Sequence, residues 1–300
     1  MVCSDGVLPE MTLPLVDYVF LMLLISVIAG LVGALVGVGG GIIIVPVLTL
    51  FFNIPVGYAI GTSIVSVIAT SSGSASAYVK DKITNLRVGT FLVTATTVGA
   101  TAGAITTIYL IASGLSWAVY LSFGIVLLFS ALDFSLRIWR RGYSGEEEVN
   151  KIPNTLAERL ELKGEYYDIA LKQSTSYIAD RVPEGYGIML VAGVLSGLLG
   201  IGSGALKVIG MDRMMKLPFK VSTTTSNLMI GVTAAASAGI FYVKGFVNPI
   251  LVAPVAVGVL LGAYAGSKIL IRVRPSSLRV LFVIVLVVLG TEMLQKGLVF

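Results

Sequence analysis

The chain has no histidine and a single cysteine, Cys3. The lack of histidine excludes imidazole acid–base chemistry and His-ligated metals, and one cysteine excludes both a disulfide framework and a Cys-based metal site. The P-loop pattern GxxxxGK[ST] and the GxSxG motif are missing. The run GVGGG is no dinucleotide fingerprint, because it does not lie in a strand–turn–helix unit. We therefore expect no enzyme activity, no cofactor and no bound metal, although a separate ATPase subunit stays open.

Charged residues are also scarce. They make up 12% of the chain against roughly 25% in an ordinary soluble domain, whereas 56% of the residues are hydrophobic. A soluble protein of this size could not cover its surface with so few charges. The net charge of +5 indicates basic loops beside membrane segments rather than nucleic-acid binding. We predict an all-α, multi-pass protein of the cell membrane, whose partners are the lipid bilayer and a small anionic substrate. A homodimer is left open.

The same apolar segment occurs twice, 163 residues apart. Residues 29–41 read AGLVGALVGVGGG and residues 192–204 read AGVLSGLLGIGSG. Later landmarks keep this offset without a gap, because Pro55 matches Pro218 and Thr62-Ser63 match Thr225-Ser226. A duplicated apolar unit with glycine-rich breaks at matching positions is typical of a transporter whose site lies between the repeats.

Eight segments are long and apolar enough to span a bilayer, which needs about 20 residues. They are residues 17–36, 57–79, 88–111, 115–137, 186–201, 221–243, 249–271 and 278–296. Two shorter pieces, 42–53 and 204–216, each follow a glycine run and end before Pro55 or Pro218. We predict short tilted or re-entrant helices there, because such backbone is tolerated at membrane depth only inside protein or along a cavity.

Basic loops predict the orientation. The first copy carries them at Lys80, Lys82 and Arg87, and at Arg137, Arg140 and Arg141, whereas the second copy carries them at the alternate loops, with Lys216, Lys220, Arg272 and Arg274. This alternation favours two inverted repeats. The expected domains are an extracytoplasmic N-terminus (1–16), a first repeat (17–137), a cytoplasmic linker (138–185) and a second, inverted repeat (186–297). The linker is expected to hold a short amphipathic helix and loops, as a plain connection or a regulatory element.

The first copy, GLVGALVGVGGGIIIVPVLTLFFNIPVGYAIGTS, is similar to the amino-terminal half of the sulfite exporter TauE/SafE family of permeases, and the second copy resembles that family's second half. The second copy departs from the pattern at Ser203, at Gly210 and at Lys207, and Asp212-Arg213 add further charge. The resemblance implies movement of small sulfur oxyanions or organosulfonates across the cytoplasmic membrane.

The candidate substrate-binding residues are of three kinds. Exposed backbone N–H groups at a glycine-opened helix start can bind an anion, hydroxyls and amides can donate to its oxygens, and a buried lysine can neutralise its charge. The candidates are Gly39, Gly40, Gly41, Thr62, Ser63, Ser66, Gly202, Ser203, Lys207, Thr225, Ser226 and Asn227. Plainer readings stay open: glycines that only allow close packing, hydroxyls that bond their own helix or a neighbouring one, and a Lys207 that snorkels to the interface or pairs with Asp212.

These features together predict a secondary transporter of small sulfur-containing anions, such as sulfite or the organosulfonate sulfoacetate. It would work by alternating access between two inverted halves, with export as the expected direction. A permease for another small anion such as a carboxylate, and a non-transporting or channel-like membrane subunit, are the alternatives.

Overall fold

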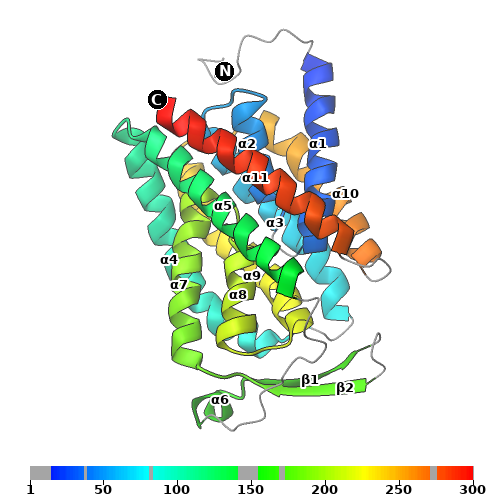
Figure 1. The fold of residues 1–300 in the computed structure, drawn as a ribbon. Coiled ribbons are helices and arrows are strands. Elements are labelled where there is room, and N and C mark those ends of the chain that lie inside the picture. The colour runs from blue at the N-terminus through cyan, green and yellow to red at the C-terminus, as the bar shows by residue number, and fades with distance from the viewer. Residues whose placement is uncertain are drawn as a thin grey trace.

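A helical bundle with one small hairpin forms the fold (Figure 1). The computed structural model describes residues 15–36, 39–80, 84–140, 155–168, 173–270 and 276–299. Each predicted spanning segment is a helix: α1 (Leu15–Val36), α3 (Val56–Lys80), α4 (Leu86–Ala112), α5 (Ser116–Arg140), α7 (Val182–Leu199), α9 (Phe219–Val243), α10 (Pro249–Leu270) and α11 (Ser276–Val299). Within the described residues, seven of these eight helices are long and apolar enough to span a membrane. The exception is α11, which is 24 residues long. The prediction of an all-α polytopic membrane protein is confirmed.

The two short pieces are also helices. They are α2 (Gly41–Leu50) and α8 (Gly204–Ile209), which continues into the π-helical turn η1 (Gly210–Met214). At 1.5 Å per residue, α2 is about 15 Å long, half of the roughly 30 Å hydrocarbon core. Asn53 and Lys216, at matching positions after the two helices, both have positive φ, 49° and 50°. The chain therefore turns in the same way at the end of each short helix.

The most extensive helix pairings join the two halves. α1 packs on α10 and its counterpart α7 packs on α4, while α3 packs on α9 and α5 on α11. Glycines allow the close approach. A Cβ at Gly262 would lie 2.0 Å from the carbonyl oxygen of Val27, and a Cβ at the matching Gly99 would lie 2.3 Å from that of Leu190. The two halves thus repeat each other's contacts as well as each other's sequence.

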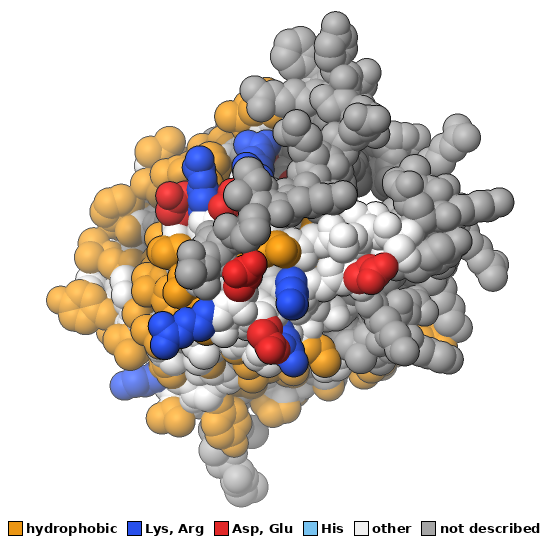
Figure 2. Space-filling model, turned by 90° about the horizontal axis from the view of Figure 1, so that it is seen from below, with side chains coloured by type: hydrophobic (Ala, Val, Ile, Leu, Met, Phe, Trp, Pro, Cys, Tyr) orange, Lys and Arg blue, Asp and Glu red, His pale blue; other side chains and the backbone are white. Residues whose placement is uncertain are grey.

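The surface divides into an apolar side and a charged end. Large hydrophobic side chains such as Phe20, Val98 and Ile125 are about 60% exposed on the helix flanks. Seen from the hairpin end, Lys, Arg, Asp and Glu side chains gather over the face, with hydrophobic side chains at one side (Figure 2). Lys216 pairs there with Asp180 at 3.4 Å. This pattern fits apolar flanks in lipid and a polar end in water.

The linker contains a β-hairpin that the sequence analysis missed. A five-residue helix α6 (Thr155–Arg159) precedes β1 (Lys163–Asp168) and the antiparallel β2 (Gln173–Ile178). The expectation of only a helix and loops was wrong, because Tyr166 and Tyr177 turn inward and pack with residues of α4, η1 and α9. Burial raises the pKa of Tyr177, and its hydroxyl accepts a hydrogen bond from Asn85 Nδ2 at 2.9 Å.

The matching helices α1 and α7 run in opposite directions. α1 begins at the end of the molecule where α11 ends, opposite the hairpin, and α7 begins at the hairpin end (Figure 1). Of the loops used to predict orientation, Lys82, Arg141, Arg272 and Arg274 lie outside the described residues, as does most of the predicted extracytoplasmic segment 1–16.

Candidate functional site

The two glycine runs meet inside the bundle. The Ser63 hydroxyl, on α3, lies 2.7 Å from the carbonyl oxygen of Gly200 and 3.4 Å from that of Gly41. A Cβ at Gly41 would lie 2.9 Å from the Gly200 oxygen, so no larger side chain fits between the runs. One hydroxyl therefore bridges the start of α2 and the end of α7, where the second glycine run begins.

Both runs use backbone that favours glycine. Gly39 and the matching Gly202 have φ of 81° and 71°, in the left-handed region. Ser203, which precedes α8, adopts φ of 42°, a strained value for a non-glycine residue. Its hydroxyl donates to the carbonyl oxygen of Ala192 on α7. The matching Gly40 has φ of −64°, so the chain turns differently at this position in the two repeats.

In each repeat, a serine of the helix that follows the short helix bonds a backbone carbonyl of that short helix. Ser226, on α9, donates to the carbonyl oxygen of Gly204 at 3.3 Å, which matches the bond from Ser63 to Gly41. Ser66 instead donates to Thr62 O of its own helix at 2.8 Å. Thr225 accepts from the backbone N–H of Asn85 at 3.1 Å. Ser66 and Thr225 thus fit the plainer structural reading.

Two buried polar groups next to these serines lack a partner. Thr62 Oγ1 and Asn227 Nδ2 have no hydrogen-bond partner within the described part of the chain. Thr62 is fully buried and Asn227 is 2% exposed. An unpartnered buried donor costs about 1–3 kcal/mol. These two groups are therefore the best candidates to bind a ligand directly.

Lys207 lies completely inside the protein. Its exposed fraction is zero, and its Nζ donates to Thr233 Oγ1 at 3.0 Å. Thr233 lies 3.0 Å from Thr96 of α4 and donates to Met229 O at 2.7 Å. Full burial contradicts snorkelling to the interface. Lys207 makes no hydrogen bond to Thr62, Ser63 or Asn227 among the described residues.

The structure adds site residues that the sequence analysis missed. Thr233 accepts the hydrogen bond from the Lys207 ammonium, and Thr96 pairs with the Thr233 hydroxyl. Ser196, in the last turn of α7, has a buried hydroxyl without a partner in the residues described. A threonine in an apolar helix carries no signal of its own. Ser196 could have been noticed, because it lies four residues before the left-handed Gly200 that opens the second glycine run.

All twelve candidates are buried within the bundle. The described residues include no group of three or more His, Cys, Asp or Glu that could hold a metal ion. The candidates that contact one another are Ser63 with Gly41 and Ser226 with Gly204, whereas Lys207 bonds Thr233 instead of another candidate. Together they supply glycine-opened backbone, hydroxyl and amide groups without a partner among the described residues, and one lysine. Such a set of groups suits an acceptor-rich ligand.

Seven apolar spanning helices around two short, glycine-opened helices define a multi-pass membrane protein of the transporter class. The profile of the family described as sulfite exporter TauE/SafE matches residues 22–293. The chain belongs to this family, and its place in the cell membrane follows from both findings.

Relatives support the same class. The chain is 28% identical over 285 residues to the probable membrane transporter protein YunE of Bacillus subtilis (strain 168), which covers 92% of this chain and 97% of the relative. It is 29% identical over 249 residues to the probable membrane transporter protein YdhB of the same organism, covering 83% and 89%. No solved structure gives a significant match. The family and these names indicate a transporter rather than an enzyme.

Proposed function

We propose that this transporter carries small sulfur-containing anions, such as sulfite or an organosulfonate like sulfoacetate. The observation that carries the proposal is the pair of partnerless buried donors, Thr62 Oγ1 and Asn227 Nδ2, each next in sequence to a serine that bonds a glycine run. The family description names sulfite. Sulfite and sulfonate groups offer several acceptor oxygens in a small volume, which matches a cluster of donors.

Positive charge for the proposed anion comes from a helix dipole in the first half and from a lysine side chain in the second. α2 is 10 residues long and begins at the first glycine run without a side-chain cap, so its dipole and free N–H groups favour an anion. α8 has only six residues and a weaker dipole. Lys207, three residues into α8, supplies positive charge there. A fully desolvated anion needs several donors and a nearby cation.

Transport by alternating access between two inverted halves is part of this proposal. The candidate residues are buried, so a bound anion could leave only if helices move. The opposite directions of α1 and α7 and the matching contacts across the halves support an inverted relation (Figure 1). The charged hairpin end would then be cytoplasmic, with export as the proposed direction.

Reconstituted protein in liposomes tests the substrate class. Vesicles loaded with sulfite, thiosulfate, sulfoacetate or taurine, and in parallel with acetate, would be followed for saturable release. We expect release of sulfite or a sulfonate at carrier rates, and its loss in Asn227→Leu. Release of acetate alone would move the assignment to a carboxylate permease. Rates far above carrier turnover would indicate a channel-like protein.

A further inference from the structure

Two matching residues on α5 and α11 reach the short helix of the opposite half. Asp133 and Lys296 are 163 residues apart and therefore occupy equivalent positions. Lys296 Nζ donates to the carbonyl oxygen of Thr49 in α2 at 2.6 Å. Asp133 Oδ1 pairs with Arg213 Nη2 in η1 at 3.0 Å. Opposite charges at equivalent positions thus make the same kind of connection.

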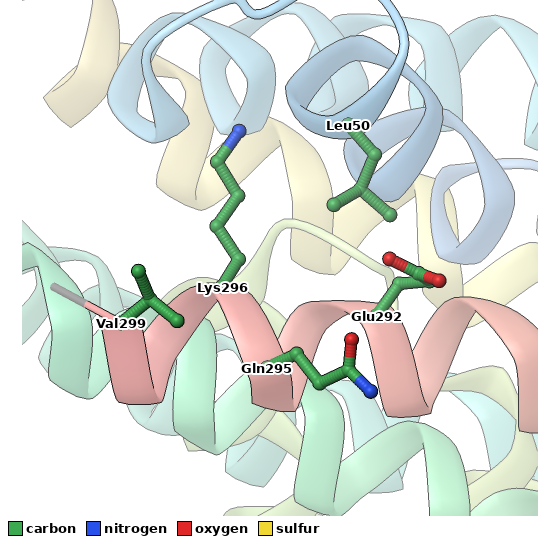
Figure 3. Close-up of a pocket in the computed structure, with 5 residues that line it drawn as sticks. All are labelled: Leu50, Glu292, Gln295, Lys296 and Val299. Carbon is green, nitrogen blue, oxygen red and sulfur yellow. The ribbon is translucent and has the colours of Figure 1, made fainter.

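Lys296 bonds α2 at its C-terminal end, where backbone carbonyls need hydrogen-bond donors. Thr49 is in the last turn of α2, where helix carbonyls lack intrahelical partners and the dipole favours a cation. The Lys296 side chain points from α11 toward α2, and Glu292 and Gln295 lie along the same groove (Figure 3). Its Nζ also lies 5.8 Å from the centre of the Tyr120 ring on α5.

The two connections differ in their surroundings. The position that matches Arg213 is Leu50, which carries no charge, and a cavity of about 390 Å³ lies there beside Lys296. At this end of α2 the Lys296 amine bonds the Thr49 carbonyl and the Thr49 hydroxyl contacts Met293 Sδ at 3.5 Å, whereas η1 is joined to α5 by an ion pair whose Asp133 side chain is 9% exposed. Lys296 therefore makes the charged contact between α11 and the end of α2.

We propose that Lys296 and Asp133 are positioning residues for the anion site. Each holds the C-terminal end of a short helix unit whose N-terminal end carries a glycine run. α2 is about 15 Å long, so we expect release of its C-terminal end to shift the glycine run at its other end. An ångström of misplacement is enough to weaken binding strongly. This inference rests on the proposed anion transport by the same site.

Binding of sulfite to the full-length protein in detergent, measured by calorimetry, is the first test. We expect Lys296→Met to weaken binding about tenfold, in line with the loss of one charge-assisted hydrogen bond. Lys296→Arg, which keeps a cation and donors, should restore most of it. The matched control is Glu292→Gln, which removes a charge from the same groove without touching the bond to Thr49 and should leave affinity unchanged.

A second readout does not depend on the substrate. Ile43, near the start of α2, is 8% exposed, and Ile43→Cys in a Cys3→Ser background reports on the glycine end of this helix. Lys296→Met should speed its labelling by a small membrane-permeant maleimide, and Glu292→Gln should not. If Lys296→Met does not fold, Lys296→Gln, a neutral donor, replaces it.

The ion pair between Asp133 and Arg213 allows an independent test in the second half. Asp133→Asn and Arg213→Asp should each weaken sulfite binding, and the charge-reversed pair Asp133→Arg with Arg213→Asp should recover part of the loss. Unchanged labelling and unchanged affinity in Lys296→Met would overturn the positioning role. Failure of the wild type to bind any sulfur anion would count against the proposed function instead, and the labelling experiment would still decide the positioning role.

Discussion

Replacing Lys207 by methionine should stabilise the protein while it weakens substrate binding. A lysine at the centre of a membrane segment costs about 2.5–3.5 kcal/mol on insertion scales. The bond from its Nζ to Thr233, at 3.0 Å, returns about 1.5–3 kcal/mol as a charge-assisted hydrogen bond. Methionine has a similar volume, and Thr233 keeps its bond to Met229 O at 2.7 Å. The net effect on folding is therefore about 0–2 kcal/mol of added stability.

The same substitution removes the cation that the proposal places at the site. Binding should weaken by at least about 1.5 kcal/mol, roughly tenfold. Lys207→Ala should weaken binding as much but also lower stability, because it leaves a cavity. Lys207→Arg should recover only part of the affinity, since the planar guanidinium needs a different geometry.

Calorimetric titration with sulfite and thermal unfolding in the same detergent measure the two effects together. The expected signature is an unfolding temperature that is unchanged or higher, with a weaker affinity. Unchanged affinity together with a lower unfolding temperature in Lys207→Met would refute the reasoning. It would mean that Lys207 is structural and that backbone and hydroxyl donors hold the anion alone.

Three further substitutions test the site and the orientation. Asn227→Leu should weaken sulfite binding about tenfold with little loss of stability, because its Nδ2 makes no bond that folding would lose; a large drop in unfolding temperature would argue against this. Ser63→Ala should destabilise the protein by about 1 kcal/mol, seen in thermal unfolding, since it removes the 2.7 Å bond to Gly200 O. Leu160→Cys in a Cys3-free background should be labelled by an impermeant maleimide in inside-out vesicles only, and labelling of intact cells would reverse the proposed topology.

The helix pattern could be predicted almost completely from the sequence. Long apolar runs fix where spanning helices lie, and a constant offset transfers each landmark from one half to the other. α7 begins at Val182 rather than at residue 186, because Pro183 fits the first turn, where its missing N–H has no partner to lose. The short pieces end at Leu50 and Met214, earlier than the predicted residues 53 and 216, while Pro55 and Pro218 come directly before α3 and α9.

Side-chain partners were harder to predict than helices. The hairpin was missed because a short strand between polar loops has a weak signal, and its inward Tyr166 and Tyr177 find their core only in the folded protein. The direction of Lys207 toward Thr233 depends on how α8 packs against α9, which spacing along the chain does not report. The role of Lys296 was hidden for the same reason, since its partner lies 247 positions away.

The packing across the halves bears on how such a chain arose. Each large helix face is covered by the other half: α1 by α10, α7 by α4, α3 by α9 and α5 by α11. Both buried clusters draw residues from the two halves, so each half is best regarded as one subunit of a pair that shares a peptide chain. An ancestor encoding one half would have had to pair with a second copy of itself. Within one chain the stoichiometry is fixed and the two copies can differ, as Asp133 and Lys296 do with opposite charges at matching positions.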